Sequence, residues 1–228
     1  MLNNRIIKLL IIFLVFNGLN SCRQLVIVST PNDPITEIKS EVKNIDGADF
    51  ERLQDSLGLF GIYSVPSYYG GLSPMYKMAS VYQQIDYDYE GDCLNFSGGM
   101  MPLCVNILIF KGGEYNIIDS KDELRETFAP IESEEEALSY VCAYTNTYPM
   151  YEFDLPFRYR RYVWKLYKSH AKKVEGGYEV LTYDYQTFGC GPHNHYSIVS
   201  FVDFNGNVSL LKQKKVYADP LEDGLCVD

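Results

Sequence analysis

The stretch from Tyr178 to Val216 constrains the fold more than any other part of this 228-residue chain. Its apolar runs are rich in β-branched and aromatic residues, and a short Cys/His loop and the pair Asn205-Gly206 separate them. Asn-Gly is the strongest short hairpin signal, because both residues tolerate positive φ angles. We therefore expect three successive strands. Strands joined by such short connections pair antiparallel, so the other segments have to cover an antiparallel sheet.

The segments before residue 172 supply helices and further strands. Ser120 and Ser133 each precede a glutamate by three residues, which is the capping-box pattern of a helix start. The second helix carries apolar residues at helical spacing, suited to lying on a sheet. Other expected elements are a helix at 49–57, strands at 76–89, 103–110 and 114–118, and a hairpin at 173–186, while 149–172 fits either strand or helix. We predict an α+β fold: a curved antiparallel sheet with one or two helices packed across one face.

The first 21 residues have the features of an export signal. A positive start with Arg5 and Lys8 precedes an apolar run that is too short for a confident membrane span. The tetrad Leu19-Asn20-Ser21-Cys22 resembles the lipobox of bacterial lipoproteins, which implies that Cys22 becomes the lipid-modified first residue. The alternative is an ordinary signal peptide, with Cys22 as a disulfide partner. In some bacteria, an aspartate directly after the lipidated cysteine marks retention at the inner membrane. This chain has Arg23 at that position, which favours the outer membrane.

The remaining chain divides into a tether and a folded domain. Residues 22–48 contain two prolines and scattered acids, which suits an extended spacer after the lipidated cysteine. Leu25 to Val28 is an alternative edge strand. Residues 49–228 are expected to form a single α+β domain, with a possible subdivision near residue 119.

The last half of the chain, from about Asp119, resembles a pattern found in bacterial lipoproteins of no known activity. The stretches that carry this resemblance are NIIDSKDELRETFAPIESEEEALSYV, GGYEVLTYD and FGCGPH. The resemblance implies a cell-envelope location and brings no activity with it.

The charge of the chain argues against one class of partner. There are 20 Lys and Arg against 30 Asp and Glu, and removal of the leader would leave 18 basic residues, a net charge of −12. Such acidity repels phosphate backbones, so we expect no nucleic-acid binding through a broad basic face. The local basic run between Arg158 and Lys173 is interpreted as a solvated face.

Six cysteines in an exported chain indicate disulfides. Setting Cys22 aside leaves an odd number, so one cysteine has to be unpaired. Cys142 lies on the apolar stripe of the second helix and is the candidate for a buried free thiol. Spacing does not select the pairing, although Cys93 with Cys104 and Cys190 with Cys226 are the most plausible pairs. The disulfide candidates are Cys93, Cys104, Cys190 and Cys226.

The segment Cys190-Gly191-Pro192-His193-Asn194-His195 is the candidate ligand loop. If Asn194 is extended, His193 and His195 project from the same side, and a nearby thiolate would complete a soft metal site. The spacing matches no recognised zinc pattern, so no metal or cofactor is assigned. The alternatives are a structural loop with Cys190 in a disulfide, and a polar ligand pocket formed by the two histidines with Asp184.

Motifs that would identify an enzyme are missing from the sequence. It has no Gly-x-Ser-x-Gly elbow, no phosphate-binding glycine loop and no His-Glu-x-x-His, so no catalytic residue is predicted. We expect a lipid-anchored envelope protein that acts by binding, as an accessory, adaptor or inhibitor (immunity-type) subunit with an envelope protein partner. The alternatives are a metal or small-ligand binder that uses Cys190, His193 and His195, and a hydrolase of unknown class.

Overall fold

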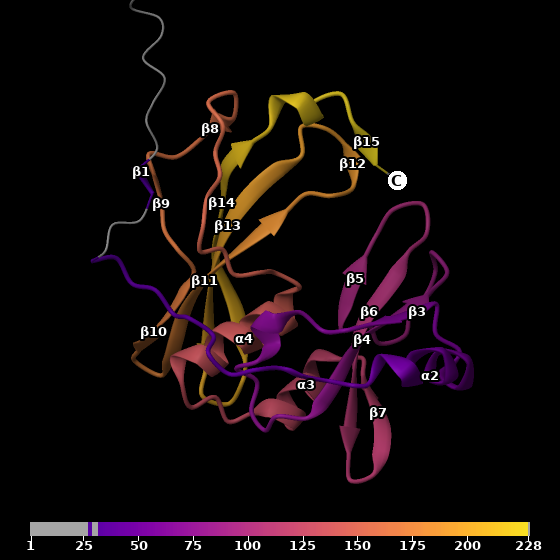
Figure 1. The fold of residues 1–228 in the computed structure, drawn as a ribbon. Coiled ribbons are helices and arrows are strands. Elements are labelled where there is room, and N and C mark those ends of the chain that lie inside the picture. Colours follow the sequence, from indigo (N-terminus) through magenta and orange to yellow (C-terminus); the bar gives the residue numbers. More distant parts are fainter. Residues whose placement is uncertain (1–26, 29–31, 228) are drawn as a thin grey trace, which may run out of the picture.

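Two β-sheets flank a pair of helices (Figure 1). The structure, a computed structural model, describes residues 27–28 and 32–227. The first sheet is built from residues before position 119 and the second from residues after position 159, with two helices between them in the chain. The predicted α+β fold with a curved sheet packed against helices is confirmed.

The first sheet has the order β2-β4-β6-β5, with β3 paired to β4 and β7 paired to β6. Most of these pairs are antiparallel, whereas β2 runs parallel to β4. The predicted hairpin around Gly112 and Gly113 is confirmed, and both glycines have positive φ angles. The strands are β2 (Lys43–Asn44), β3 (Gly61–Tyr63), β4 (Lys77–Gln84), β5 (Asn95–Ser97), β6 (Leu103–Lys111) and β7 (Glu114–Ile118).

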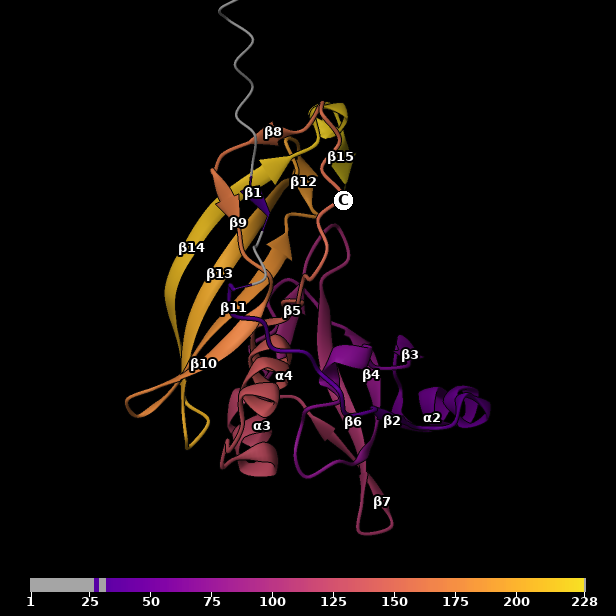
Figure 2. The same cartoon turned by 60° about the vertical axis from the view of Figure 1, so that its left-hand side comes forward.

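The second sheet is antiparallel, with the order β10-β11-β13-β14-β8. Its strands are β8 (Arg160–Arg161), β10 (His170–Val174), β11 (Gly177–Tyr185), β13 (Asn194–Asp203) and β14 (Val208–Ala218). Figure 2 shows how strongly these strands bend. Two register shifts between β13 and β14 lie within the bend, and such irregularities increase local twist.

Two small ladders complete the sheet structure. β1 (Ile27–Val28) pairs in parallel with β9 (Lys165–Leu166), and β12 (Gly189–Cys190) pairs with β15 (Cys226–Val227). The segment 149–172, which fitted strand or helix equally well, contains β8, β9 and the start of β10, joined by irregular chain.

The helices are α2 (Phe50–Leu57), α3 (Lys121–Phe128) and α4 (Glu134–Thr145), with single 3-10 turns η2 (Gly47–Asp49), η3 (Ser67–Tyr69) and η4 (Pro220–Glu222). The helix predicted at 49–57 is thus confirmed. In the part of the chain that the structure describes, none of the helices has both the length and the hydropathy that a membrane span requires.

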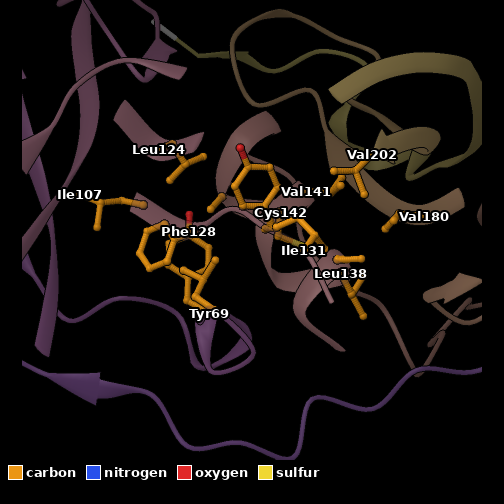
Figure 3. Close-up of a cluster of buried hydrophobic side chains, with 14 of the residues drawn as sticks. Tyr69, Ile107, Leu124, Phe128, Ile131, Leu138, Val141, Cys142, Val180 and Val202 are labelled. Carbon is orange, nitrogen blue, oxygen red and sulfur yellow. The ribbon is translucent and has the colours of Figure 1, made fainter. Parts of the chain in front are cut away.

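Helix α4 lies at the centre of the main core. Every residue from Glu136 to Ala143 is buried, so the helix is enclosed around its whole circumference. Figure 3 shows Ile107 of the first sheet on one side of the helix and Val180 and Val202 of the second sheet on the other. The sequence predicted an apolar stripe against one sheet, whereas the helix packs against residues of both sheets.

Both predicted helix starts are capped. The Oγ atoms of Ser120 and Ser133 accept hydrogen bonds from the backbone N–H groups three residues later, at 3.2 and 3.1 Å. Each glutamate reaches one residue further back than a standard capping box. The carboxylate of Glu136 accepts from the N–H of Glu132 at 2.8 Å, not from that of Ser133.

Residues 32–48, expected to be part of an extended spacer, are integrated into the fold. The buried Thr36 hydroxyl exchanges hydrogen bonds with the backbone of Ala171, at 3.1 and 2.9 Å. The Glu135 carboxylate accepts from two successive backbone N–H groups, those of Lys39 and Ser40. This segment also adds β2 to the first sheet. Pro34 favours an extended path, but the path lies on the protein surface. Of the alternative edge strand from Leu25 to Val28, Ile27–Val28 forms β1, whereas Leu25, Val26 and Cys22 lie outside the described residues.

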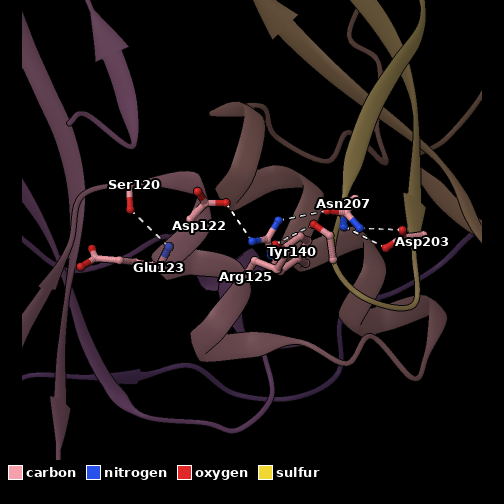
Figure 4. A network of polar contacts seen from close by, with 8 residues as sticks. Ser120, Asp122, Glu123, Arg125, Tyr140, Asp203 and Asn207 are labelled. Atoms are coloured by element: carbon pink, nitrogen blue, oxygen red, sulfur yellow. Dashed lines mark hydrogen bonds and ion pairs between the residues drawn. The ribbon is translucent and has the colours of Figure 1, made fainter. Parts of the chain in front are cut away.

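The hairpin of β13 and β14 is tied to helix α4 (Figure 4). The Asp203 carboxylate accepts from the backbone N–H groups of Asn205 and Asn207, both at 2.9 Å, and Gly206 has a φ angle of 82°. The hydroxyl of Tyr140 donates to the carbonyl of Gly206 at 2.9 Å in a buried position. The guanidinium of Arg125 on α3 also donates to Asn207 Oδ1, at 3.1 Å. The turn is therefore fixed by its own carboxylate and by one side chain from each of the two helices.

We predict that Tyr140→Phe lowers the free energy of unfolding by about 1–2 kcal/mol, because a buried carbonyl loses its donor while packing is retained. Denaturant unfolding measures this change. Tyr144→Phe is the matched control, since Tyr144 lies one turn further along α4 and is only partly buried. Equal destabilisation by the two variants would contradict the assigned role of the Tyr140 hydroxyl.

Candidate functional site

The predicted Cys/His loop is fastened to the end of the chain. Cys190 is bonded to Cys226, which joins the short strands β12 and β15. This bond closes a loop with a sequence separation of 36, worth about 4 kcal/mol in the chain-entropy model. In this state Cys190 offers no thiolate to a metal or a substrate.

His193 is fully buried, and both of its ring nitrogens face backbone carbonyls. Nδ1 lies 2.7 Å from the oxygen of Gln186, and Nε2 lies 3.3 Å from the oxygen of Leu225. The ring therefore lies between the residue that follows β11 and the C-terminal tail. Neither nitrogen is open to an external ligand.

His195 lies in a different environment, between aromatic rings. Its ring centroid is 4.2 Å from that of Tyr217, nearly parallel to it, and 4.6 Å from that of Tyr185. Nδ1 lies 3.5 Å from the hydroxyl of Tyr148. Burial lowers the pKa of His195 from 6.5 to about 4, so the imidazole is neutral at neutral pH.

The candidate ligand loop is thus held by structural contacts on all three of its predicted residues. Cys190 is in a disulfide, His193 bridges carbonyls and His195 is stacked. Among the described residues, no group of three or more His, Cys, Asp and Glu side chains has a metal-binding arrangement. The geometry corresponds to the structural interpretation of this loop, one of those that the sequence left open.

The remaining described cysteines are also accounted for. Cys93 is bonded to Cys104, and Cys142 is a buried free thiol on α4. Burial raises the pKa of Cys142 well above its usual value, which keeps the thiol protonated and unreactive. Disulfide formation, expected from the cysteine count, is confirmed.

A hollow of about 330 Å³ lies on the face of the second sheet that is turned away from α4. Side chains alternate along a strand, so Val180 points to the helix and Leu181 to this outer face. The floor of the hollow consists of Leu181, Val199 and Val216. Val163, just before β9, and Leu166, within it, form an apolar wall beside this floor. We call this site the lysine-rimmed hollow.

The rim of the lysine-rimmed hollow is basic. Lys165, Lys212 and Lys214 line it, together with His170 and one acid, Glu179. The strand register places Leu181 opposite Val199, and Val199 opposite Lys212. Apolar floor and cationic rim are therefore neighbours in one row across the sheet.

The sequence contained only part of the signal for this site. Lys212 and Lys214 alternate along a predicted strand, which places them on one face. The wall around Val163 could not be predicted, because the pattern of 149–172 did not distinguish strand from helix and the parallel pairing with β1 spans well over 100 residues of sequence.

No protein-family model, curated protein or solved structure matches this chain.

We predict that His195 makes the protein less stable in acid. A folded-state pKa near 4 lies below the unfolded value of about 6.5, so the unfolded chain binds more protons between these values. The stabilisation is complete above pH 6.5 and is lost as the pH falls toward 4. Because His195 is partly exposed, we expect a loss of roughly 1–2 kcal/mol at pH 4.5 relative to pH 7.

Denaturant unfolding of the protein and of His195→Phe at both pH values measures this loss. Phenylalanine keeps an aromatic ring between Tyr185 and Tyr217 but does not titrate. The variant should lose less stability on acidification than the unaltered protein. An identical loss in both proteins would contradict the prediction.

Proposed function

We propose that this protein is a lipid-anchored component of a bacterial cell envelope, on the outer membrane rather than the inner, and that it acts by binding. The anchor is proposed from the lipobox-like sequence at Cys22, which lies outside the described residues. The binding role is supported by the lysine-rimmed hollow, an apolar concavity with convergent polar groups. An accessory, adaptor or inhibitor role with an envelope protein partner belongs to the same proposal.

The point at which the chain leaves the domain supports a membrane-facing orientation. Cys22 is five residues before Ile27, whose backbone pairs with Lys165 of β9. A fully extended chain of five residues spans at most about 18 Å, so a lipid on Cys22 would lie close to β9.

The surface around β9 has the composition of a membrane interface. Tyr162, Trp164 and Tyr167 are 41, 65 and 41% exposed. Tryptophan and tyrosine prefer the headgroup region of a bilayer, because each combines an apolar ring with a hydrogen-bonding group. Lys215 lies over the ring of Tyr162, at 5.3 Å, and adds a positive charge beside these rings. We infer that this aromatic surface faces the membrane.

We predict that Cys22→Ser releases the protein from the membrane fraction, because no acyl chain is then attached and the domain itself has no helix in its described part that would span the bilayer. Fractionation of cells that express either form measures the change. Cys142→Ser is the control, since the thiol of Cys142 is buried and takes no part in anchoring. Membrane association that persists without Cys22 would refute the anchor.

We predict that the fluorescence of Trp164, the only tryptophan in the chain, shifts to shorter wavelength when the lipidated protein is inserted into vesicles. The indole then moves from water into the interface. Lipids brominated near the headgroup should quench it.

The matched control for the fluorescence measurement is the double variant Trp164→Phe with Phe60→Trp. Phe60 is also exposed, at 47%, but it precedes β3 in the first sheet, on the other side of the helices (Figure 1). Its emission should stay that of a solvated indole. Equal quenching at both positions would contradict the orientation.

A further inference from the structure

We propose that the lysine-rimmed hollow binds a small anionic amphiphile, a molecule with an apolar body and a carboxylate or phosphate head. The inference specifies the ligand class for the binding role proposed above. It does not depend on the lipid at Cys22, so the two ideas fail separately.

The floor and wall of the hollow fit an apolar body. Leu181, Val199 and Val216 project from three adjacent strands, and Val163 and Leu166 close over them. The ring of Tyr183 extends this surface, while its hydroxyl is already used in a hydrogen bond to the carbonyl of Tyr167 at 2.5 Å. The lining therefore offers apolar contacts to an alkyl chain or a ring. The Tyr183 hydroxyl already has a hydrogen-bond partner and needs none from the ligand.

The position for an anionic head is set by Lys212 and Lys214. They are two residues apart on one strand face, which places their Cα atoms about 7 Å apart. Within residues 32–227, neither ammonium group forms an ion pair with a carboxylate. Two like charges on one face repel each other, and an anion between them would relieve this repulsion.

The positions of the other charges around the hollow localise its positive end. Lys165 Nζ lies 2.7 Å from an Asp33 carboxylate oxygen. Glu179, the acid at the other end, lies directly opposite Lys172 in the strand register. The excess positive charge is therefore on β14, beside the apolar floor, in a protein whose overall charge is −10.

The dimensions select a small molecule rather than a polymer. A volume of about 330 Å³ is at the lower end of typical small-molecule sites. The apolar floor and the cationic rim then set the chemistry of that molecule. An alkyl chain with a charged head meets both requirements.

Binding of three eight-carbon probes by the full chain with Cys22→Ser tests the proposal. Octanoate, octanol and octyltrimethylammonium share the chain length and differ in the charge of the head, and calorimetry compares their affinities. We expect octanoate to bind at least tenfold more tightly than octanol, and the cation to bind least. Equal affinity for octanoate and the cation, or no binding of octanoate, would overturn the proposal.

Charge reversal locates the head. Lys212→Glu with Lys214→Glu should weaken octanoate binding at least tenfold and leave octanol binding nearly unchanged. The matched control is Lys43→Glu with Lys77→Glu, an exposed pair of lysines that are opposite each other in the first sheet, so the net charge changes equally. The same loss in both double variants would show a general charge effect and overturn the assignment.

If the rim variant fails to fold, NMR on the chain with unaltered rim lysines still tests the proposal. Octanoate should shift the methyl NMR signals of Leu181, Val199 and Val216, while those of Val180 and Val202, on the α4 side of the same strands, stay in place. Shifts confined to other parts of the protein would overturn the proposal.

Discussion

The enclosure of α4 between two sheets is the constraint on which the rest of the structure depends. Residues such as Met78 and Ile107 of the first sheet and Val180 and Val202 of the second belong to one cluster around this helix, while each sheet has a smaller cluster on its other face. Burial of a helix on all sides requires a partner for every polar group: Ser133 and Glu136 cap the start of α4, and the hydroxyl of Tyr140 donates to Gly206 from its middle. Because α4 covers the inner side of the second sheet, the outer side is left for the hollow.

Local chemistry in the sequence was sufficient to predict the elements near turns and caps. Ser120, Ser133, the Gly112-Gly113 pair and Asn205-Gly206 each specify backbone geometry within a few residues, and the structure has helices and hairpins at these places. The α+β class followed from the grouping of these elements. Pairing over long sequence distances was not predictable in the same way, because nothing local to Ile27 specifies Lys165 as its neighbour.

In the candidate site, too, local sequence identified unusual residues but not their distant partners. Sequence identified Cys190, His193 and His195 as the most unusual cluster, and the structure does hold all three in specific contacts, but the partners that decide their chemistry come from elsewhere. The carbonyl of Leu225 and the rings of Tyr185 and Tyr217 occupy the histidines. Conversely, the lysines of β14 look ordinary in sequence, and only the wall that crosses the sheet above them turns a strand face into a concavity.

The wall of the hollow is also the place where the N-terminal chain joins the domain. β9 is held by two residue pairs with β1, Ile27 with Lys165 and Val28 with Leu166. Val163 and Leu166 line the hollow, whereas Trp164 is exposed to solvent. With the proposed lipid on Cys22, tension between a membrane and the domain would act first on these two pairs. The same strand supplies part of the wall of the hollow, so the proposed anchor and the proposed ligand site would be mechanically linked through β9.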